Sequence, residues 1–231
     1  MNNYKPLTII IAEAALETIP TALQNHPVIL KHARKRGKPP HEILLDVSVH
    51  YPAMKEKLPE FYKRGRPDLI HVTLLNTLES PLNRKGLLRI YVHTINDIIV
   101  FIDPKTRLPK NYNRFVGLME QLFKEGKVPP DSRYPLMTLR NLSLKDLLRK
   151  ISPKEPILLS EKGEHIRFRG LVRHIIRNGN PIIIGGFQHG DFSEKTYSLT
   201  NKIYRVYEEP LPTWIITSHL VTLYEDELNI I

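Results

Sequence analysis

Short apolar runs alternate with longer helical stretches along the chain. Apolar runs bounded by turn residues predict buried strands at residues 7–11, 43–45, 87–92, 98–102, 157–159 and 182–184. The stretches between them predict helices over residues 21–36, ending at Gly37, over 68–78, following Pro67, and over 114–124, ending at Gly126. This alternation predicts an α/β fold with a mostly parallel sheet flanked by helices.

Three local signals refine this picture. Asn96 and Asp97 lie between two β-rich runs and predict a hairpin, whereas Ser143 followed by Asp146 predicts the start of a helix over residues 144–151. The proline-rich residues 128–135 predict a surface loop. Because the sequence has no internal repeat and no low-complexity tract, residues 1–231 are interpreted as one domain with an insertion around residues 87–135.

Composition excludes several classes of protein. The chain has no cysteine, which removes disulfides and thiolate chemistry and is typical of a reducing compartment. The apolar run near the amino terminus is too short for a membrane span and lacks the layout of a signal peptide. Thirty-four Lys and Arg against 24 Asp and Glu give a formal charge of +10. We therefore expect a polyanionic partner, of which nucleic acid is the commonest. A basic protein can also owe this charge to solubility or thermal adaptation.

The most informative segment is residues 181–192, where a predicted buried strand leads directly into a loop with three glycines. Missing β-carbons let main-chain amides approach a ligand, and strand ends in α/β sheets are common ligand sites. The spacing fits neither the dinucleotide nor the P-loop motif. Taken alone, such a loop is more often a tight turn that needs positive φ than a ligand site, so a nucleotide-like ligand is only one of two interpretations.

Downstream of the glycines, residues 202–206 predict another strand, residues 208–212 a break, and residues 213–225 a helix. That helix carries Trp214 among regularly spaced apolar positions, a pattern more typical of a core or subunit contact than of a cofactor site.

Positive charge is concentrated in residues 31–38, 63–66 and 105–114. The third cluster interleaves Arg107, Lys110 and Arg114 with Tyr112, a mixture suited to phosphate contacts and base stacking. Asp68 follows Arg66 at a helix start, where it can orient the guanidinium or simply stabilise the helix terminus. For the clusters, the alternative to an RNA surface is a solvated charged face.

Six segments in order, residues 41–46, 64–71, 80–83, 86–89, 113–118 and 185–192, resemble the Nep/Emg family of ribosome-biogenesis methyltransferases. The resemblance covers nearly the whole chain. It implies a SPOUT-type domain with a carboxy-terminal trefoil knot, acting as a homodimer that methylates N1 of a pseudouridine in small-subunit rRNA. The implied cofactor is S-adenosyl-L-methionine, and ribosomal proteins or assembly factors are expected as further partners. The expected location is cytoplasmic, or nucleolar in a eukaryote, without membrane association.

The resemblance also implies roles for individual residues. Arg66 and Asp68 are the expected catalytic pair, with Asp46 and Asp191 as weaker candidates for direct participation. Arg66, Arg107, Lys110 and Arg114 are expected to meet RNA. The expected cofactor-binding residues are Leu158, Gly185, Gly190, Ile203, Tyr204, Arg205, Val206, Tyr207 and Glu208. This chain departs from the family pattern at Gln188, Lys110 and His219, which affects specificity more than cofactor binding.

Two other functions compete with the enzyme. A non-catalytic RNA-binding assembly factor would share the basic surface but would need neither an occupied glycine loop nor a methylated product. A metal-dependent hydrolase is disfavoured, because the ten histidines are scattered and form no H-x-x-x-H pair, so no metal site is expected.

Overall fold

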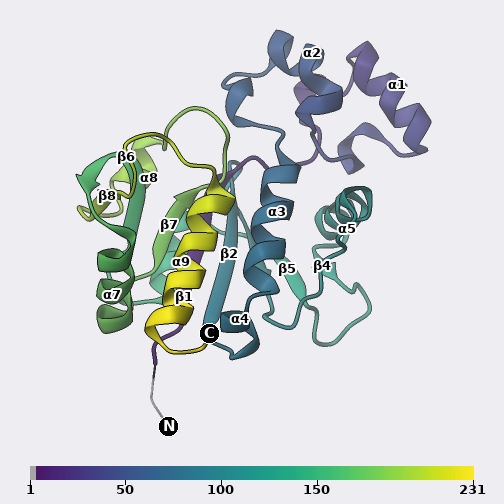
Figure 1. The fold of residues 1–231 in the computed structure, drawn as a ribbon. Coiled ribbons are helices and arrows are strands. Elements are labelled where there is room, and N and C mark those ends of the chain that lie inside the picture. Colours follow the sequence, from purple (N-terminus) through teal and green to yellow (C-terminus); the bar gives the residue numbers. More distant parts are fainter. Residues whose placement is uncertain (1–3) are drawn as a thin grey trace.

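A single eight-stranded sheet runs through the computed structural model, which describes residues 4–231 (Figure 1). Its strand order is β4-β5-β3-β2-β1-β7-β6-β8. The strands are β1 (Leu7–Ala14), β2 (Leu88–Thr94), β3 (Ile98–Ile102), β4 (Lys127–Val128), β5 (Met137–Asn141), β6 (Ile157–His165), β7 (Ile182–Gly185) and β8 (Ile203–Arg205). Strands β2, β1, β7, β6 and β8 are mutually parallel, and β3, β5 and β4 extend the sheet in antiparallel pairs.

The central strands are the most apolar, because both of their faces are covered. In β1, Ile9 pairs in register with Ile90 of β2 on one side and Ile182 of β7 on the other, and all three are buried. Continuous apolar runs of this kind are typical of parallel strands between two helical layers. The predicted α/β fold is therefore confirmed.

Helices cover the sheet on both faces. One face packs against α3, α4, α5, α7 and α9, and the other against α6 and α8. The helices are α1 (Pro27–Arg36), α2 (Val47–Lys57), α3 (Pro67–Leu78), α4 (Pro81–Arg84), α5 (Tyr112–Glu125), α6 (Leu144–Ile151), α7 (Phe168–Asn178), α8 (Glu194–Tyr197) and α9 (Thr213–Glu227). In Figure 1, α3 and α9 lie side by side over the parallel strands.

Residues 15–66 leave the sheet after β1 and return at α3. They contain α1, α2 and three short 3₁₀ turns, η1 (Thr21–Leu23), η2 (Pro40–Glu42) and η3 (Phe61–Lys63), packed around a separate apolar cluster that includes Ile29, Leu45 and Met54. Figure 1 shows α1 and α2 projecting beyond the end of the sheet, above the amino terminus of α3. This excursion lies next to the carboxyl end of β1.

Two expectations from the apolar pattern were wrong in detail. Residues 43–45 are buried, but they form only one bridge, between Leu44 and Thr18, because Asp46 immediately begins α2 as its N-cap. The helix expected over residues 21–36 is interrupted, since Pro27 starts a new helix with His26 as its cap.

The other local expectations were confirmed. β2 and β3 form an antiparallel hairpin, with Asp97 in the left-handed region at φ 56°. The Ser143 side chain caps α6 by accepting from the Asp146 amide at 3.2 Å. Residues 128–135 form a loop apart from Val128, which closes the short strand β4. No helix within residues 4–231 is both long and apolar enough to cross a bilayer.

Candidate functional site

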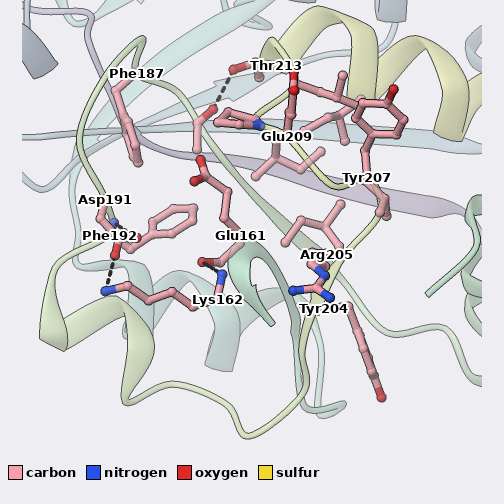
Figure 2. A pocket seen from close by; sticks show the side chains of 18 of the residues that line it. Glu161, Lys162, Phe187, Asp191, Phe192, Tyr204, Arg205, Tyr207, Glu209 and Thr213 are labelled. Atoms are coloured by element: carbon pink, nitrogen blue, oxygen red, sulfur yellow. Dashed lines mark hydrogen bonds and ion pairs between the residues drawn. The ribbon is translucent and has the colours of Figure 1, made fainter. Parts of the chain in front are cut away.

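A cavity of about 210 Å³ lies at the carboxyl ends of β6 and β7 (Figure 2). Its apolar walls come from Leu159, Ile184, Phe187, Leu211 and Ile216, and its charged groups from Glu161, Lys162, Asp191, Arg205 and Glu209. The residues after β7 form one side of the cavity, and those after β8 form the other. Apolar walls with a few charged groups at the mouth suit a flat aromatic ligand that carries polar substituents.

The glycine loop after β7 is tied to its neighbours by its main chain. The Gly186 amide donates to Ala12 O at 2.8 Å, and the Ala15 amide donates to Gly186 O at 2.8 Å. The Thr213 hydroxyl donates to Gly185 O at 2.6 Å and so fixes the start of α9 beside the end of β7. The loop is thus held by β1 on one side and by α9 on the other.

Six of the nine expected cofactor-binding residues line this cavity: Gly185, Gly190, Tyr204, Arg205, Val206 and Tyr207. The other three lie outside its wall. Leu158 and Ile203 pair in register between β6 and β8 and pack into the core on the α6 side. Glu208 is exposed between two lining residues, Tyr207 and Glu209.

Local sequence patterns do not predict the wall formed by the middle of β6, residues Leu159, Ser160, Glu161 and Lys162. Lys162 pairs with Asp191 at 2.5 Å across the cavity, and the Tyr197 hydroxyl donates to Asp191 at 2.5 Å. Although burial alone would raise the pKa of Asp191, these two contacts and the Phe192 amide hold it below its usual range. Asp191 is therefore an ionised anchor of the glycine loop.

Arg66 and Asp68 form a bidentate ion pair at the start of α3. Arg66 Nε donates to Asp68 Oδ1 at 2.8 Å and Nη2 donates to Oδ2 at 2.7 Å. Burial would raise the pKa of Asp68, but the guanidinium and main-chain amides at the helix start lower it instead. The Arg66 guanidinium also donates to the side-chain oxygen of Gln188 in the glycine loop. Arg66 thus contacts the cavity wall through Gln188, and Asp68 holds Arg66 from the other side, although neither side chain lines the cavity itself.

Many cations in the first two basic clusters neutralise buried acids. Glu120 accepts from both Arg36 and Lys38 at 2.7 Å, which attaches the end of α1 to α5. Arg64 donates to Glu17 at 2.7 and 2.5 Å through two nitrogens. These side chains are part of the framework, which sequence reasoning could not detect because their acids lie tens of residues away.

Arg107, Lys110 and Arg114 are exposed on residues 103–114, the segment that leads from β3 into α5. This segment packs along α3, where His71 Nε2 bonds Pro109 O at 2.7 Å. Lys110 lies 3.7 Å from Glu79, an exposed pair of small energetic consequence. The structure therefore leaves these three cations available to a partner.

Tyr112, at the start of α5, donates to the Asp46 carboxylate at 2.5 Å. Burial and the neighbouring Asp46 charge both raise the pKa of Tyr112, so the phenol stays protonated. Asp46 also accepts from the Ser48 amide at 2.9 Å as the N-cap of α2. Asp46 therefore joins α2 to α5. Within residues 4–231 no group of three or more His, Asp or Glu side chains is placed to hold a metal ion.

Fold and cavity together define an α/β protein with a nucleotide-type ligand site at the carboxyl ends of parallel strands and a cationic surface next to it. The chain belongs to the EMG1/NEP1 methyltransferase family, whose model matches residues 9–225.

Similar proteins cover the full length of the chain. The ribosomal RNA small subunit methyltransferase Nep1 of Staphylothermus marinus is 51% identical over 231 residues, 100% of both chains. The protein of the same name from Thermococcus kodakarensis is 43% identical over 97% of this chain and 100% of its own. The crystal structure of Archaeoglobus fulgidus Nep1 bound to S-adenosylhomocysteine superposes with a TM-score of 0.85 at 37% identity, covering 97% of this chain and 99% of that one.

Proposed function

We propose that this protein transfers a methyl group from S-adenosyl-L-methionine to N1 of a pseudouridine in small-subunit rRNA. The observation that carries the proposal is the juxtaposition of the glycine-loop cavity with Arg66, through its contact with Gln188. Relatives named as small-subunit rRNA methyltransferases support the substrate class, and the relative solved with S-adenosylhomocysteine supports the cofactor.

The residues around the cavity fit this cofactor. A β-carbon at Gly185 would lie 3.0 Å from the ring of Phe187 and 3.4 Å from that of Phe192, so a larger residue would push these rings from their places beside the cavity. Apolar side chains can enclose an adenine ring, while Glu161, Arg205 and Glu209 offer partners for ribose hydroxyls and for the amino and carboxyl groups. The expected set of nine, from Leu158 to Glu208, is retained in the proposal, with Leu158, Ile203 and Glu208 acting through the residues next to them.

When bound, S-adenosyl-L-methionine supplies a methyl group already activated on a sulfonium. The chain's contribution is to bring the base and this group into line and to exclude water. In our proposal, Arg66 provides a fixed positive charge for the electron density that develops on the base as its N1 proton leaves. Asp68 acts as the residue that positions Arg66, because its lowered pKa keeps it charged and paired.

RNA is proposed to approach along residues 103–114. Arg107, Lys110 and Arg114 would contact phosphates, and Arg66 would meet the target nucleotide at the other end of this surface. Extruding the base costs a few kcal/mol, roughly what several such contacts can offset.

The remaining parts of the proposal concern organisation. We infer one domain over residues 1–231, with an insertion around residues 87–135 that supplies the antiparallel strands β3 and β4, and a trefoil knot in the carboxy-terminal segment. A homodimer is supported by apolar groups on the helical face, including Val72 at 40% exposure and the half-buried Trp214. We place the protein in the cytoplasm, with ribosomal proteins or assembly factors as further partners.

Incubation with labelled S-adenosyl-L-methionine and a pseudouridine-bearing stem-loop, followed by nucleoside mass spectrometry, tests the proposal. One methyl group on pseudouridine, and none on a matched uridine stem-loop, is the expected result. Tight RNA binding without any methylated product would reject the enzyme and favour a non-catalytic assembly factor.

A further inference from the structure

A second pocket, of about 430 Å³, lies at the opposite end of α3 from Arg66. It forms where the carboxyl end of α3 meets α4 and the segment that follows β3. Three cations line it, Arg84, Lys105 and Arg107, together with Leu78, Asn83 and Pro104. Only Arg107 belongs to the expected RNA-binding set. The pocket shares no lining residue with the glycine-loop cavity.

Charge at this pocket is uncompensated. Arg84, Lys105 and Arg107 are exposed, no acid lines the pocket, and their side chains form no ion pair or hydrogen bond within residues 4–231. By contrast, Arg36, Lys38 and Arg64 each contact a buried carboxylate. Three unpaired cations around one hollow repel one another and raise the local concentration of anions. The pocket therefore has the charge expected of an anion site.

The two loops that carry these cations are held in place. Asn83, only 6% exposed, donates from Nδ2 to Leu78 O at 2.7 Å and to Pro104 O at 2.8 Å, which joins α3 to the segment after β3. The buried Thr106 donates to Leu136 O at 3.1 Å. Asp103, the nearest acid in this segment, accepts from the Lys105 main-chain amide at 2.7 Å and so fixes the turn. A site fixed in this way loses little conformational entropy on binding.

The pocket is continuous with the proposed RNA surface. Residues 104–114 start in the pocket at Pro104, pass α3 where Pro109 meets His71, and reach Tyr112 beside Asp46. The twelve residues of α3 span about 18 Å, so the pocket lies several nucleotides from a base held near Arg66. A polyanion bound along this segment reaches both ends of α3.

We propose that this pocket binds phosphodiester groups of the RNA strand that flanks the target nucleotide. The inference rests on the proposed function, because it takes the target base to lie near Arg66. Arg84 and Lys105 extend the RNA contacts of Arg107 and fix the register of the strand, so the enzyme binds more of its substrate than the stem-loop that carries the reactive base.

The test compares R84M and K105M with K85M, which removes another exposed charge next to Arg84 but outside the pocket. Affinity is measured over a range of salt concentrations for a stem-loop with single-stranded flanks and for the same stem-loop without them. We expect each pocket variant to weaken binding of the flanked RNA about three- to tenfold and to reduce the slope of log K against log salt by about 0.7. Binding of the short RNA stays unchanged, and K85M stays within about twofold of the native protein.

If R84M, K105M and K85M lose equal RNA affinity, or if the pocket variants affect both RNAs equally, the proposed phosphate site is rejected in favour of diffuse surface charge. Thermal unfolding of each variant identifies a loss that is due to misfolding. The two hypotheses remain separable. If the native protein binds the flanked RNA through these residues but transfers no methyl group, the proposed function fails and the pocket stands. If it methylates the RNA and the pocket variants behave like K85M, only the pocket fails.

Discussion

The Lys63 ammonium group donates to the Glu13 carboxylate beneath the glycine loop, and both side chains are buried. Lys63 also donates to Asp191 O at 2.6 Å and lies 4.4 Å from the centre of the Phe187 ring. Glu13 accepts from the Ser193 amide at 3.0 Å and the Ser193 hydroxyl at 2.7 Å. One buried ion pair therefore supports the loop that forms the cavity wall, and it joins that loop to the residues just before Arg66.

Replacing Lys63 with Met tests whether Lys63 holds the glycine loop in place for the ligand, in addition to stabilising the fold. Removing one partner of a buried pair costs about 3–5 kcal/mol in the free energy of unfolding, because Glu13 is left without a counter-charge. We also expect binding of S-adenosylhomocysteine, measured by calorimetry on protein that denaturation shows to be folded, to weaken at least about tenfold. The loss arises because the loop no longer has its contact at Asp191 O.

R64M is the matched control for this substitution. Arg64 neutralises Glu17, which is 2% exposed, and within residues 4–231 its side chain forms no hydrogen bond or ion pair with the glycine loop. The control should lose comparable stability and retain ligand affinity within about twofold. Equal weakening of ligand binding in the two variants would show that Lys63 acts only through overall stability.

The sequence predicts the sheet well where apolar runs are long and continuous, as in β1 and β7, because burial on both faces requires them. The prediction fails at residues 43–45, because three apolar residues suit a buried strand and a buried connecting segment equally well. The residues that follow determine which structure forms, and here Asp46 is the N-cap of α2 and not a further strand residue.

Some residues of the candidate site could likewise be expected from the sequence, and others could not. Gly185 and Gly190, which line the cavity, were expected from the family resemblance, because a glycine loop after a strand is also explained as a tight turn. Glu161 and Lys162 were not, since nothing in a local pattern says that the end of β6 turns toward β8. Nor does local sequence distinguish Arg64, which pairs with a buried acid, from Arg107, which does not. Long-range pairing decides which cations remain available.

Gly190→Val should strongly weaken cofactor binding without unfolding the protein. Gly190 has φ 98°, and a β-carbon there would lie 3.0 Å from Tyr62 Cε2, so a branched side chain forces the loop to move. The control is Gly37→Val, at φ 61° with nothing within 4 Å of the new β-carbon. Calorimetry with S-adenosylhomocysteine should give at least about tenfold weaker binding for G190V. G37V should show only a stability loss of about 1–2 kcal/mol. Unchanged titration of G190V would contradict the assignment of the loop.

Arg66→Ala should abolish methyl transfer and preserve cofactor affinity. The substitution removes the charge near the target base, and we expect kcat to fall at least about 100-fold, as for other fixed electrostatic groups. R66K keeps the charge but loses the two-pronged contact with Asp68, so it should recover only part of the activity. Q188A is the control, because it removes the contact between Arg66 and the loop but leaves the Arg66–Asp68 pair. A parallel loss of S-adenosylhomocysteine binding in R66A would reject this division of roles.

Protonation of His50 should lower the free energy of unfolding as the pH decreases through a defined range. The Asp46 amide donates to His50 Nδ1 at 3.0 Å, so the neutral ring carries its proton on Nε2 and donates to His32 Nδ1 at 2.8 Å. Burial, and then the neighbouring His32, lower the pKa of His50 from its ordinary value of 6.5 to about 4, with Arg36 acting in the same direction and Asp46 against it. The folded protein therefore disfavours a second proton on this ring until the pH falls to about 4.

Between pH 6.5 and about 4 the unfolded chain therefore binds a proton that the folded chain excludes. The contribution of His50 to stability is complete above pH 6.5 and is lost as the pH falls through this window, to a total of about 3 kcal/mol. Urea denaturation at half-unit pH steps should show this loss in the native protein. H50L, which cannot titrate, should be less stable at pH 8 because the Asp46 amide loses its partner, but its free energy of unfolding should fall less steeply. Because His32 loses its hydrogen-bond partner in H50L, the difference between the two curves reports the His50–His32 pair. Parallel curves from pH 6.5 to 4 would mean that the folded ring accepts a proton as readily as the unfolded one.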